Sequence, residues 1–326
     1  MNARLQILLL TVLVASCHVT NAEETKIEPV ATSTVHAQEF IGCWKADGDK
    51  PFFFRCEPTR VSWYDPDRNQ LQAFRATYGT GIFINVMGRK IPLPVTLKNG
   101  VLVFAGKTGE KKLRKIDQVP DELTFTPLQL GKTREVPAME LKVIQEELAK
   151  RFKEDQRVRP DPNVQGNWEK VDDKDMHKVD ADNTAYLLTM VSQYGWIDVA
   201  RFGSDASLSA WFIVQHSGHL PLMLAVLPET RKELVKRKTA KVGIGEVNVA
   251  ESYAMLYDRV QVMLGNKQRY GSQMGQNEKG KTLILALEDP KRVDEFRAEI
   301  GLDPILPGLK LMKQQNPKQA IEIEDE

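Results

Sequence analysis

Most of the sequence signatures that assign a reaction are missing from this chain of 326 residues. It has no Gly-x-Ser-x-Gly elbow and no Gly-x-Gly-x-x-Gly dinucleotide fingerprint. A charge excess is missing as well, because 45 Lys and Arg stand against 44 Asp and Glu, and no basic cluster is interleaved with aromatic residues. The chain therefore lacks the positive field that attracts nucleic acid, and we expect no nucleic-acid partner.

Long apolar runs are scarce too. The run Leu5–Ala15 follows a basic start at Met1–Arg4 and is far shorter than the roughly 20 residues that a bilayer-spanning helix needs. It ends in Val14-Ala15-Ser16-Cys17, which fits the lipobox of bacterial lipoproteins. A basic start, a short apolar core and small residues at the exit are typical of a secretory signal. We therefore expect residues 1–17 to be a signal peptide with a lipobox, and the membrane to be a partner through lipid on Cys17.

An alternative cleavage site, Thr20-Asn21-Ala22, would suit ordinary signal peptidase and would release a soluble secreted or periplasmic protein. Both interpretations place the mature chain outside the cytoplasm, and the lipobox favours the cell envelope as its location. Residues 18–37 are polar and have no periodicity, so we expect a flexible tether between the anchor and the first domain.

Cysteine is rare, with three residues in the chain. Cys17 is assigned to lipidation, which leaves Cys43 and Cys56 as an even pair in an oxidising compartment. The turn Asp47-Gly48-Asp49-Lys50 separates two predicted strands, and a hairpin centred between Asp49 and Lys50 sets Cys43 opposite Cys56. Opposed residues of an antiparallel pair lie close enough for a bridge, so we predict a disulfide; two free buried thiols are the alternative.

From residue 38 to residue 134 the chain contains a series of short runs rich in Val, Ile, Phe and Tyr. Turn residues separate these runs at regular spacing, which is typical of an antiparallel meander that forms a small barrel or a sandwich. The predicted strands are Phe40–Trp44, Pro51–Glu57, Arg60–Tyr64, Leu71–Thr77, Gly81–Met87, Lys90–Thr96, Val101–Ala105 and Lys112–Ile116.

Residues 135–318 have apolar residues that recur at helical spacing. Asp180 or Asp182 is expected to cap the second of these helices and Ser204 the third. The predicted helices are Ala138–Arg157, Asp182–Tyr194, Ser204–Ser217, Leu220–Lys238, Val247–Leu264 and Pro290–Ile300, with one strand at Thr282–Leu287. The fold class we predict is therefore α+β, with an antiparallel β-domain, a mainly helical domain and a frayed acidic tail at residues 319–326.

Several apolar stripes in the helical half end in a polar residue on the same face. A polar group on a buried face is costly unless it is hydrogen-bonded, by about 1–3 kcal/mol for each unpaired group. If the stripe ends converge, they form one buried polar cluster, which is the pattern expected of an active or binding site. The residues are Asp155, Asn183, Gln215, His216 and Asp258. The alternative is a structural network of helix caps and buried ion pairs that ties the helices together.

Histidine titrates nearest to neutral pH, so His216 is the candidate general acid or base. Asp155 and Asp258 are the carboxylates that would orient it, and Arg159 and Arg259 would hold an anionic group of the substrate. The remaining candidate substrate-binding residues are Asn183, Gln215, Gln268, Tyr270 and Gln273.

His216 and His219 are three residues apart and can share a face and a metal ion. The pair lacks the glutamate of the His-Glu-x-x-His zinc motif, and a third ligand would have to come from Asp155 or Asp258. We therefore expect no cofactor, and a divalent metal held by His216 and His219 is the alternative.

Seven short motifs are spread along the helical half. In chain order they are Asp155-Gln156-x-Val158-Arg159, Asp180-x-x-Asn183, Tyr194-Gly195-Trp196, Val214-Gln215-His216, Tyr257-Asp258-Arg259, Gln268-x-Tyr270-Gly271-x-Gln273 and Arg297-x-x-Ile300-Gly301-Leu302. In this combination residues 138–309 resemble an uncharacterised bacterial family, DUF6624, although Ser217-Gly218 stands where the family often has Ala-Asp. No reaction is assigned to the family, so the resemblance implies a shared site without naming its chemistry. The N-terminal half, with its lipobox, resembles the N-terminal regions of planctomycete envelope lipoproteins.

Two classes of function remain open at this point. We expect an envelope lipoprotein whose helical domain holds a polar pocket, with a hydrolytic reaction in which His216 acts as acid or base. The non-enzymatic alternative is a surface-tethered binding or scaffolding module that uses the β-domain at residues 38–134. The first requires a small-molecule substrate and the second a ligand or protein partner, and the sequence identifies neither.

Overall fold

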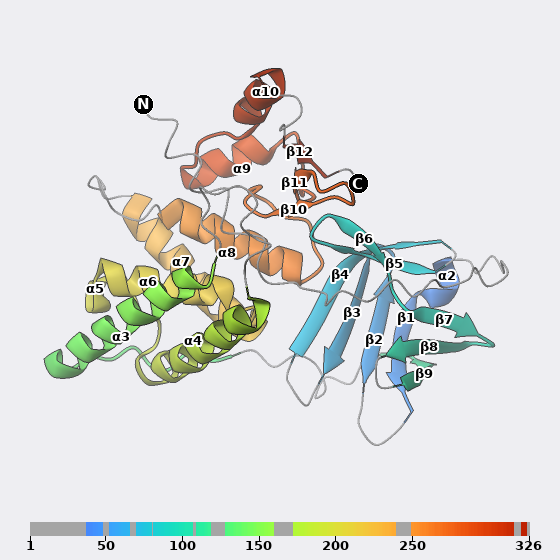
Figure 1. Cartoon of the computed structure of the whole chain (residues 1–326), viewed down its shortest axis with the longest axis horizontal. Coiled ribbons are helices and arrows are strands. Elements are labelled where there is room, and N and C mark those ends of the chain that lie inside the picture. Colours follow the sequence, from blue (N-terminus) through green and yellow to red (C-terminus); the bar gives the residue numbers. More distant parts are fainter. Residues whose placement is uncertain are drawn as a thin grey trace. The chain divides into compact units, whose positions relative to one another are not determined.

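The computed structural model describes residues 37–47, 52–65, 70–79, 81–106, 109–118, 128–159, 172–238, 249–315 and 321–324 (Figure 1). The expected signal peptide, Cys17 and all of the tether before residue 37 lie outside the described residues, so lipidation and the envelope location stay predictions. Within the described ranges, no helix is both long enough and apolar enough to cross a membrane.

The chain divides into two compact units, a helical unit and a β unit. The helical unit takes its described residues from Pro127–Arg259 and Lys291–Pro307, and the β unit takes its own from Cys17–Thr126, Val260–Pro290 and Gly308–Glu326. The β unit is therefore assembled from three separate stretches of chain. The domain boundaries expected after residues 134 and 318 stay predictions.

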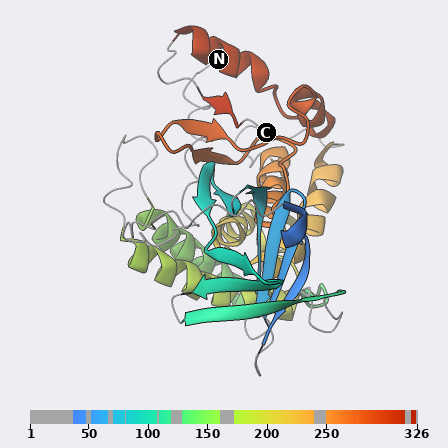
Figure 2. The ribbon, with the colours of Figure 1, turned by 90° about the vertical axis from the view of Figure 1, so that its right-hand side faces the viewer.

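The β unit is built around a nine-stranded sheet with the order β6-β5-β4-β3-β2-β1-β9-β8-β7, which curls into a half-barrel (Figure 2). Each neighbouring pair in it is antiparallel, which confirms the predicted N-terminal meander. A short helix, α2 (Ala37–Phe40), precedes the first strand. The strands are β1 (Gly42–Ala46), β2 (Phe53–Glu57), β3 (Arg60–Asp65), β4 (Gln70–Tyr78), β5 (Ile82–Val86), β6 (Arg89–Pro92), β7 (Val95–Lys98), β8 (Val101–Gly106) and β9 (Gly109–Ile116).

The two edge strands, β6 and β7, are consecutive in the chain, so the sheet has the connectivity of an up-and-down barrel that is open at one seam. The sequence predicted one strand here, at Lys90–Thr96, but Pro94 has no amide hydrogen to donate and the strand breaks in two. Instead, the nitrogen of Leu93 donates to the Ile82 carbonyl at 2.8 Å, and the Pro94 carbonyl accepts from the nitrogen of Ala105 at 2.8 Å. The segment between β6 and β7 therefore bonds to β5 through Leu93 on one side of the seam and to β8 through Pro94 on the other.

The core of the β unit is formed by the residues that point to the inner face of the curled sheet, because side chains alternate along a strand. Trp44 and Phe54 oppose each other across β1 and β2 and are 2% and 0% exposed. The remaining buried residues of this core include Phe40, Val61, Ile82, Ile84, Leu102 and Leu113.

The structure corrects the predicted disulfide, because Cys43 and Cys56 are both free thiols. The register of β1 and β2 pairs Cys43 with Arg55, one residue away from the expected pairing. A shift of one residue places the two thiols on opposite faces of the sheet. The hydrophobic core selects this register, since pairing Trp44 with Phe54 buries both aromatic rings.

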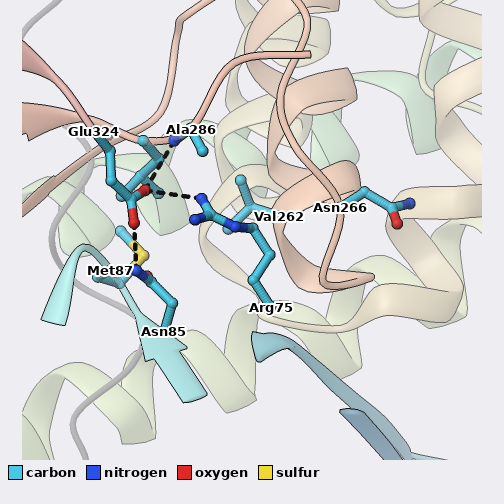
Figure 3. Close-up of a pocket in the computed structure, with 8 residues that line it drawn as sticks. Arg75, Asn85, Met87, Val262, Asn266, Ala286 and Glu324 are labelled. Carbon is cyan, nitrogen blue, oxygen red and sulfur yellow. Dashed lines mark hydrogen bonds and ion pairs between the residues drawn. The ribbon is translucent and has the colours of Figure 1, made fainter. Parts of the chain in front are cut away.

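A second sheet in the β unit has the order β10-β11-β12 and consists of β10 (Met274–Gln276), β11 (Thr282–Ile284) and β12 (Glu322–Ile323). β12 pairs in parallel with β11, which corrects the expectation of a frayed tail at this position. Two contacts join this sheet to the larger one. The nitrogen of Gln276 donates to the carbonyl of Met87, in the turn between β5 and β6, at 2.9 Å. Glu324 pairs with Arg75 of β4 (Figure 3).

The helical unit confirms the predicted α-helical half of the α+β class. The structure has α3 and α7 at the residues that the sequence predicted. The helices of the described chain in this half are α3 (Ala138–Arg157), α4 (Asp173–Tyr194), α5 (Val199–Phe202), α6 (Ser204–His216), α7 (Leu220–Lys238), α8 (Val249–Met263), α9 (Val293–Ile300) and α10 (Leu306–Gln315).

Two predicted helix caps are wrong. The cap of α4 is Asp172, whose carboxylate accepts from the nitrogen of Lys174 at 2.9 Å, so Asp180 and Asp182 lie inside the helix. The cap of α6 is Gly203, and Ser204 is the first residue of the helix. The longer α4 matters for the site, because it carries Asp180 into the packed interface of α3, α4 and α6.

The burial of Cys56 predicts a difference in thiol reactivity. Cys56 is 1% exposed and burial raises the pKa of its thiol to about 12, whereas Cys43 is partly exposed. Because the thiolate is the nucleophile, iodoacetamide at mildly alkaline pH should alkylate Cys43 and leave Cys56 unmodified until denaturant is added. Mass spectrometry of the tryptic peptides measures both yields, and equal alkylation or a disulfide-linked peptide pair would contradict the structure.

Candidate functional site

The polar ends of α3 and α6 meet at one buried pair in the helical unit. Nδ1 of His216, the last residue of α6, lies 3.0 Å from both carboxylate oxygens of Asp155 near the end of α3. The two side chains are 2% and 1% exposed. The structure therefore brings together two residues that the sequence placed at the ends of separate apolar stripes.

The position of the imidazole hydrogen follows from its partner. A carboxylate only accepts hydrogen bonds, so Nδ1 of His216 carries the hydrogen and Nε2 keeps a lone pair. This Nε2 atom is buried and has no hydrogen-bond partner among the described residues. One flank of the imidazole is apolar, because the ring of Phe212 lies 5.8 Å away between centroids. An oriented imidazole with an unused lone pair is the arrangement of a general base.

Further donors fix the carboxylate of Asp155. Nε2 of Gln156 donates to Oδ2 at 2.8 Å, and Nη1 of Arg159 lies 2.8 Å from Oδ1. On its other side, Nη2 of Arg159 lies 2.5 Å from Oδ1 of Asp180 on α4. The guanidinium of Arg159 therefore bridges two carboxylates and ties α3 to α4 beside the imidazole.

Asp180 is a member of this cluster that the sequence analysis named as a helix cap and in the motif Asp180-x-x-Asn183, but not as a candidate site residue. Asp180 is 9% exposed and lies inside α4. One signal for its position was present, because Asp180 precedes Asn183 by three residues and such a spacing puts both on one face of a helix. That signal becomes usable only when the helix is known to begin well before Asp180.

Burial shifts the pKa of His216 and the pKa of Asp180 in opposite directions. Burial lowers the pKa of His216; the Asp155 carboxylate raises it again in part, and the charges of Arg159 and Arg259 lower it. Burial raises the pKa of Asp180, against the influence of Arg159 and His216. At neutral pH the imidazole is therefore uncharged, and its Nε2 atom can accept a proton.

Two predicted substrate-binding amides lie on α4 and α6. Oδ1 of Asn183 accepts from Nη1 of Arg151 at 3.2 Å, and the Gln215 carbonyl accepts from Nη1 of Arg259 at 2.9 Å. In the part of the chain that the structure describes, Nδ2 of Asn183 and Oε1 of Gln215 are buried without a hydrogen-bond partner. One of these atoms is a donor and the other an acceptor.

Asp258 is also buried, with 0% of its surface exposed, and it lies on α8. Burial lowers the pKa of Arg297 on α9, and the carboxylates of Asp294 and Asp258 raise it. The structure thus gives Asp258 an arginine as electrostatic neighbour. The carboxylate that orients His216 is that of Asp155. A role for Asp258 stays a prediction.

Three predicted substrate-binding residues, Gln268, Tyr270 and Gln273, belong to the β unit. Nε2 of Gln268 donates to the carbonyls of Gln273 at 2.9 Å and Leu285 at 2.7 Å, and its Oε1 accepts the nitrogen of Gln273 at 2.7 Å. These bonds occupy both hydrogens of the amide. The Gln268 side chain therefore holds the shape of its own loop.

The alternative of a metal at His216 and His219 lacks further ligands. Across the described ranges, no group of three or more His, Cys, Asp or Glu residues is arranged to hold a metal ion. Nδ1 of His219 accepts from the nitrogen of Leu222 at 3.1 Å, and Nδ1 of His216 is used by Asp155. His219 therefore acts at the start of α7 as a cap for a backbone donor.

The stretch from Gly275 to Thr282 has the residue spacing of a phosphate-binding P-loop, Gly-x-x-x-x-Gly-Lys-Thr. In the structure β10 leads directly into β11 as a hairpin instead of a loop followed by a helix. Nζ of Lys281 lies 2.5 Å from Oε1 of Glu322. A P-loop binds phosphate at the N-terminus of a following helix, so this match has no structural support.

Comparison with known proteins gives one finding. The model of a family of unknown function (DUF6624) matches residues 142–317, which include Asp155, Arg159, Asp180 and His216. No curated protein and no solved structure matches the chain. The likeness of the N-terminal half to planctomycete envelope lipoproteins is therefore unsupported.

The lowered pKa of His216 predicts the sign of a pH effect on stability. An unfolded histidine takes up a proton below about pH 6.5, whereas the buried imidazole resists it. The free energy of unfolding should therefore decrease as the pH falls below about 6.5, by at most about 1.4 kcal/mol per pH unit from this residue. His216→Gln should remove this part of the slope, which denaturant unfolding at a series of pH values measures.

The charged groups that face His216 stay in place in this variant, namely Asp155, Arg159, Asp180 and Arg259. His177→Gln is the matched control, because this imidazole is exposed on α4 and loses little hydration on folding. The control should keep the wild-type slope. Identical slopes for the wild type and His216→Gln would contradict a buried, uncharged imidazole.

Proposed function

This chain belongs to DUF6624, a family of unknown function, and we propose that its helical unit carries an acid–base centre that hydrolyses a small anionic substrate. His216 is the general base and Asp155 is the residue that orients it. The observation that carries the proposal is the Nε2 atom of His216, which is buried, directed by a carboxylate through Nδ1 and unpartnered among the described residues.

Water is the nucleophile in this proposal. The hydroxyl next to His216 in sequence, Oγ of Ser217, donates to the Val214 carbonyl at 2.8 Å and is committed to the helix end. Nε2 of His216 takes a proton from water, and the Asp155 carboxylate stabilises the imidazolium that forms. General-base assistance of this kind contributes about 10²–10⁴-fold to a rate.

The two arginines have different roles in the proposal. Both terminal nitrogens of Arg159 are engaged by Asp155 and Asp180, so Arg159 positions the carboxylates. The charge of Arg259 acts on His216 from α8, where its Nη1 donates to the Gln215 carbonyl. We place an anionic substrate group near Arg259 because the charge of this residue acts on His216. The amides of Asn183 and Gln215 are further contacts in the proposal.

Burial of unpaired atoms favours a functional site over a purely structural network. Nε2 of His216, Nδ2 of Asn183, Oε1 of Gln215 and Nε of Arg159 are buried and lack partners among the described residues. Each unpaired buried group costs about 1–3 kcal/mol. A network whose role is only to tie helices together is expected to satisfy such atoms, whereas a site keeps them for a ligand.

Hydrolysis can be measured on chromogenic substrates of two classes. We expect the purified protein to hydrolyse p-nitrophenyl phosphate, bis(p-nitrophenyl) phosphate or both, because both substrates are anionic. His216→Gln and Asp155→Asn should each lower kcat/KM by about 10²–10⁴-fold, because the base or its orientation is lost. Release of p-nitrophenol gives the rate, and circular dichroism reports whether the variants are folded.

Exposed residues of the same types on α4 serve as matched controls. His177→Gln and Asp182→Asn should retain the wild-type rates, because both side chains face solvent. If the wild type is no faster than His216→Gln on every substrate of the set, the acid–base proposal is rejected and the buried network is structural.

We further propose that the protein is a lipoprotein of the cell envelope, anchored through Cys17. Support comes from the apolar run at Leu5–Ala15 and the lipobox that ends at Cys17. Expression in a bacterial host with radiolabelled palmitate should label the wild type and leave Cys17→Ser unlabelled. Label on Cys17→Ser, or release of unlabelled wild type cleaved after Ala22, would contradict the anchor.

A further inference from the structure

The C-terminal strand places a carboxylate in a cradle of the β unit (Figure 3). Oε2 of Glu324 lies 3.0 Å from Nη1 of Arg75 and accepts the nitrogen of Ala286 at 2.9 Å, while Nδ2 of Asn85 donates to Oε1. The Glu324 side chain is 9% exposed. Donors from β4, β5 and the segment after β11 thus converge on one carboxylate.

Backbone pairing holds the same segment in an extended conformation. β12 pairs in parallel with β11, and the nitrogen of Glu324 donates to the Ile284 carbonyl at 2.8 Å. Ile321, at the start of the segment, is 9% exposed. Strand addition to a sheet edge, combined with seats for individual side chains, is a recurrent mode by which proteins bind peptides.

The cradle is larger than the carboxylate that occupies it. A cavity of about 30 Å³ adjoins Glu324 and is lined in part by Arg75, Asn85, Asn266 and Met87 (Figure 3). Met87 stands at the cavity because it is the first residue of the two-residue turn between β5 and β6, where its φ of 51° and the φ of 89° at Gly88 fit a type I′ turn. The cavity is large enough for one water-sized group beside the carboxylate.

The contacts of the tail are few enough for it to leave without unfolding the sheet. The nine strands of the main sheet pair among themselves, and β12 contributes two residues to the smaller sheet. The second charged contact is a bridge between Glu322 and Lys281, whose side chains are 46% and 31% exposed. Bridges of this exposure contribute little to stability, because solvent screens the two charges. Segments with so little buried contact open locally at low free energy.

We propose that this cradle is a receptor for an extended acidic peptide segment of a partner protein, and that Ile321–Glu324 is its intramolecular ligand. The recognised pattern is a buried apolar residue followed three positions later by glutamate. Arg75 and Lys281 supply positive charge where the tail has Glu324 and Glu322, so an acidic partner strand satisfies the same groups. The proposal is independent of the acid–base centre.

Peptide binding to the full-length protein tests whether the cradle is a peptide receptor. A fluorescent peptide with the sequence of residues 319–326 is titrated into the protein and followed by anisotropy. In the wild type the tethered tail competes at an effective concentration on the order of millimolar. Glu324→Gln in the chain weakens this competitor, so its affinity for the peptide should be about tenfold higher than that of the wild type. Adding Arg75→Gln to that variant should abolish the gain.

The peptide offers a matched control of its own. A peptide with Glu324→Gln should bind Glu324→Gln protein about tenfold more weakly than a peptide with Glu322→Gln, because the first loses the buried cradle and the second only an exposed bridge. Equal affinities of the two peptides, or no binding to either protein when both are folded, would overturn the proposal.

If Glu324→Gln fails to fold, hydrogen exchange on the wild type tests whether the tail leaves the sheet without global unfolding. The nitrogens of Ala286 and Glu324 bond across the contact between the tail and the smaller sheet, whereas that of Leu285 bonds to the Gln273 carbonyl. Exit of the tail exposes the amides of Ala286 and Glu324 and leaves the bond of the Leu285 amide in place, so the first two should exchange faster than Leu285. Equal exchange rates for the three would show that the tail leaves only on global unfolding, and would overturn the proposal.

Discussion

The helical unit depends on one buried guanidinium. Arg159 lies between Asp155 and Asp180 with contacts of 2.8 and 2.5 Å, and Asp155 in turn holds the imidazole of His216. Each charged side chain in this cluster neutralises its neighbour. Removal of one therefore leaves an unpaired buried charge, which costs about 3–5 kcal/mol. The packing of α3, α4 and α6 and the orientation of His216 are therefore set by the same contacts. A site of this kind is rigid before any ligand arrives, which is what general-base geometry requires.

The residues that converge were predictable where the helical period alone determines them. Asp155 and His216 stand at helical spacing from the apolar stripes of α3 and α6, and burying those stripes brings both side chains inside. The period does not say which helix packs against which, so Asp155 and Asp258 were equivalent in the sequence, and only Asp155 has a contact with His216 that defines its role. Gln268 was predicted to bind substrate, but its partners are backbone groups of Gln273 in its own loop and of Leu285 after β11, which no side-chain pattern reveals.

Most strands of the main sheet were predictable, but the break at Pro94, the register and the C-terminal closure were not. Strand positions follow from local alternation, whereas register depends on how two aromatic residues, Trp44 and Phe54, fill a core that the rest of the sheet creates. The free thiols of Cys43 and Cys56 are a direct result of that choice. Likewise, the acidic composition of the tail suggests fraying, and its order comes from Arg75 and Asn85, more than two hundred residues earlier in the chain.

Two buried carboxylates, Asp155 and Glu324, are held in opposite ways, and their positions in the chain explain the difference. Asp155 is anchored within a turn of its arginine near the end of a twenty-residue helix, so its ion pair is a local contact that forms with the helix. Glu324 reaches its arginine from a two-residue strand at the other end of the chain, so its ion pair must offset the entropy of ordering the tail. The first arrangement suits a permanent part of a site. The second suits the proposed exchange, because a short strand with few buried contacts can be replaced by another peptide strand at low cost.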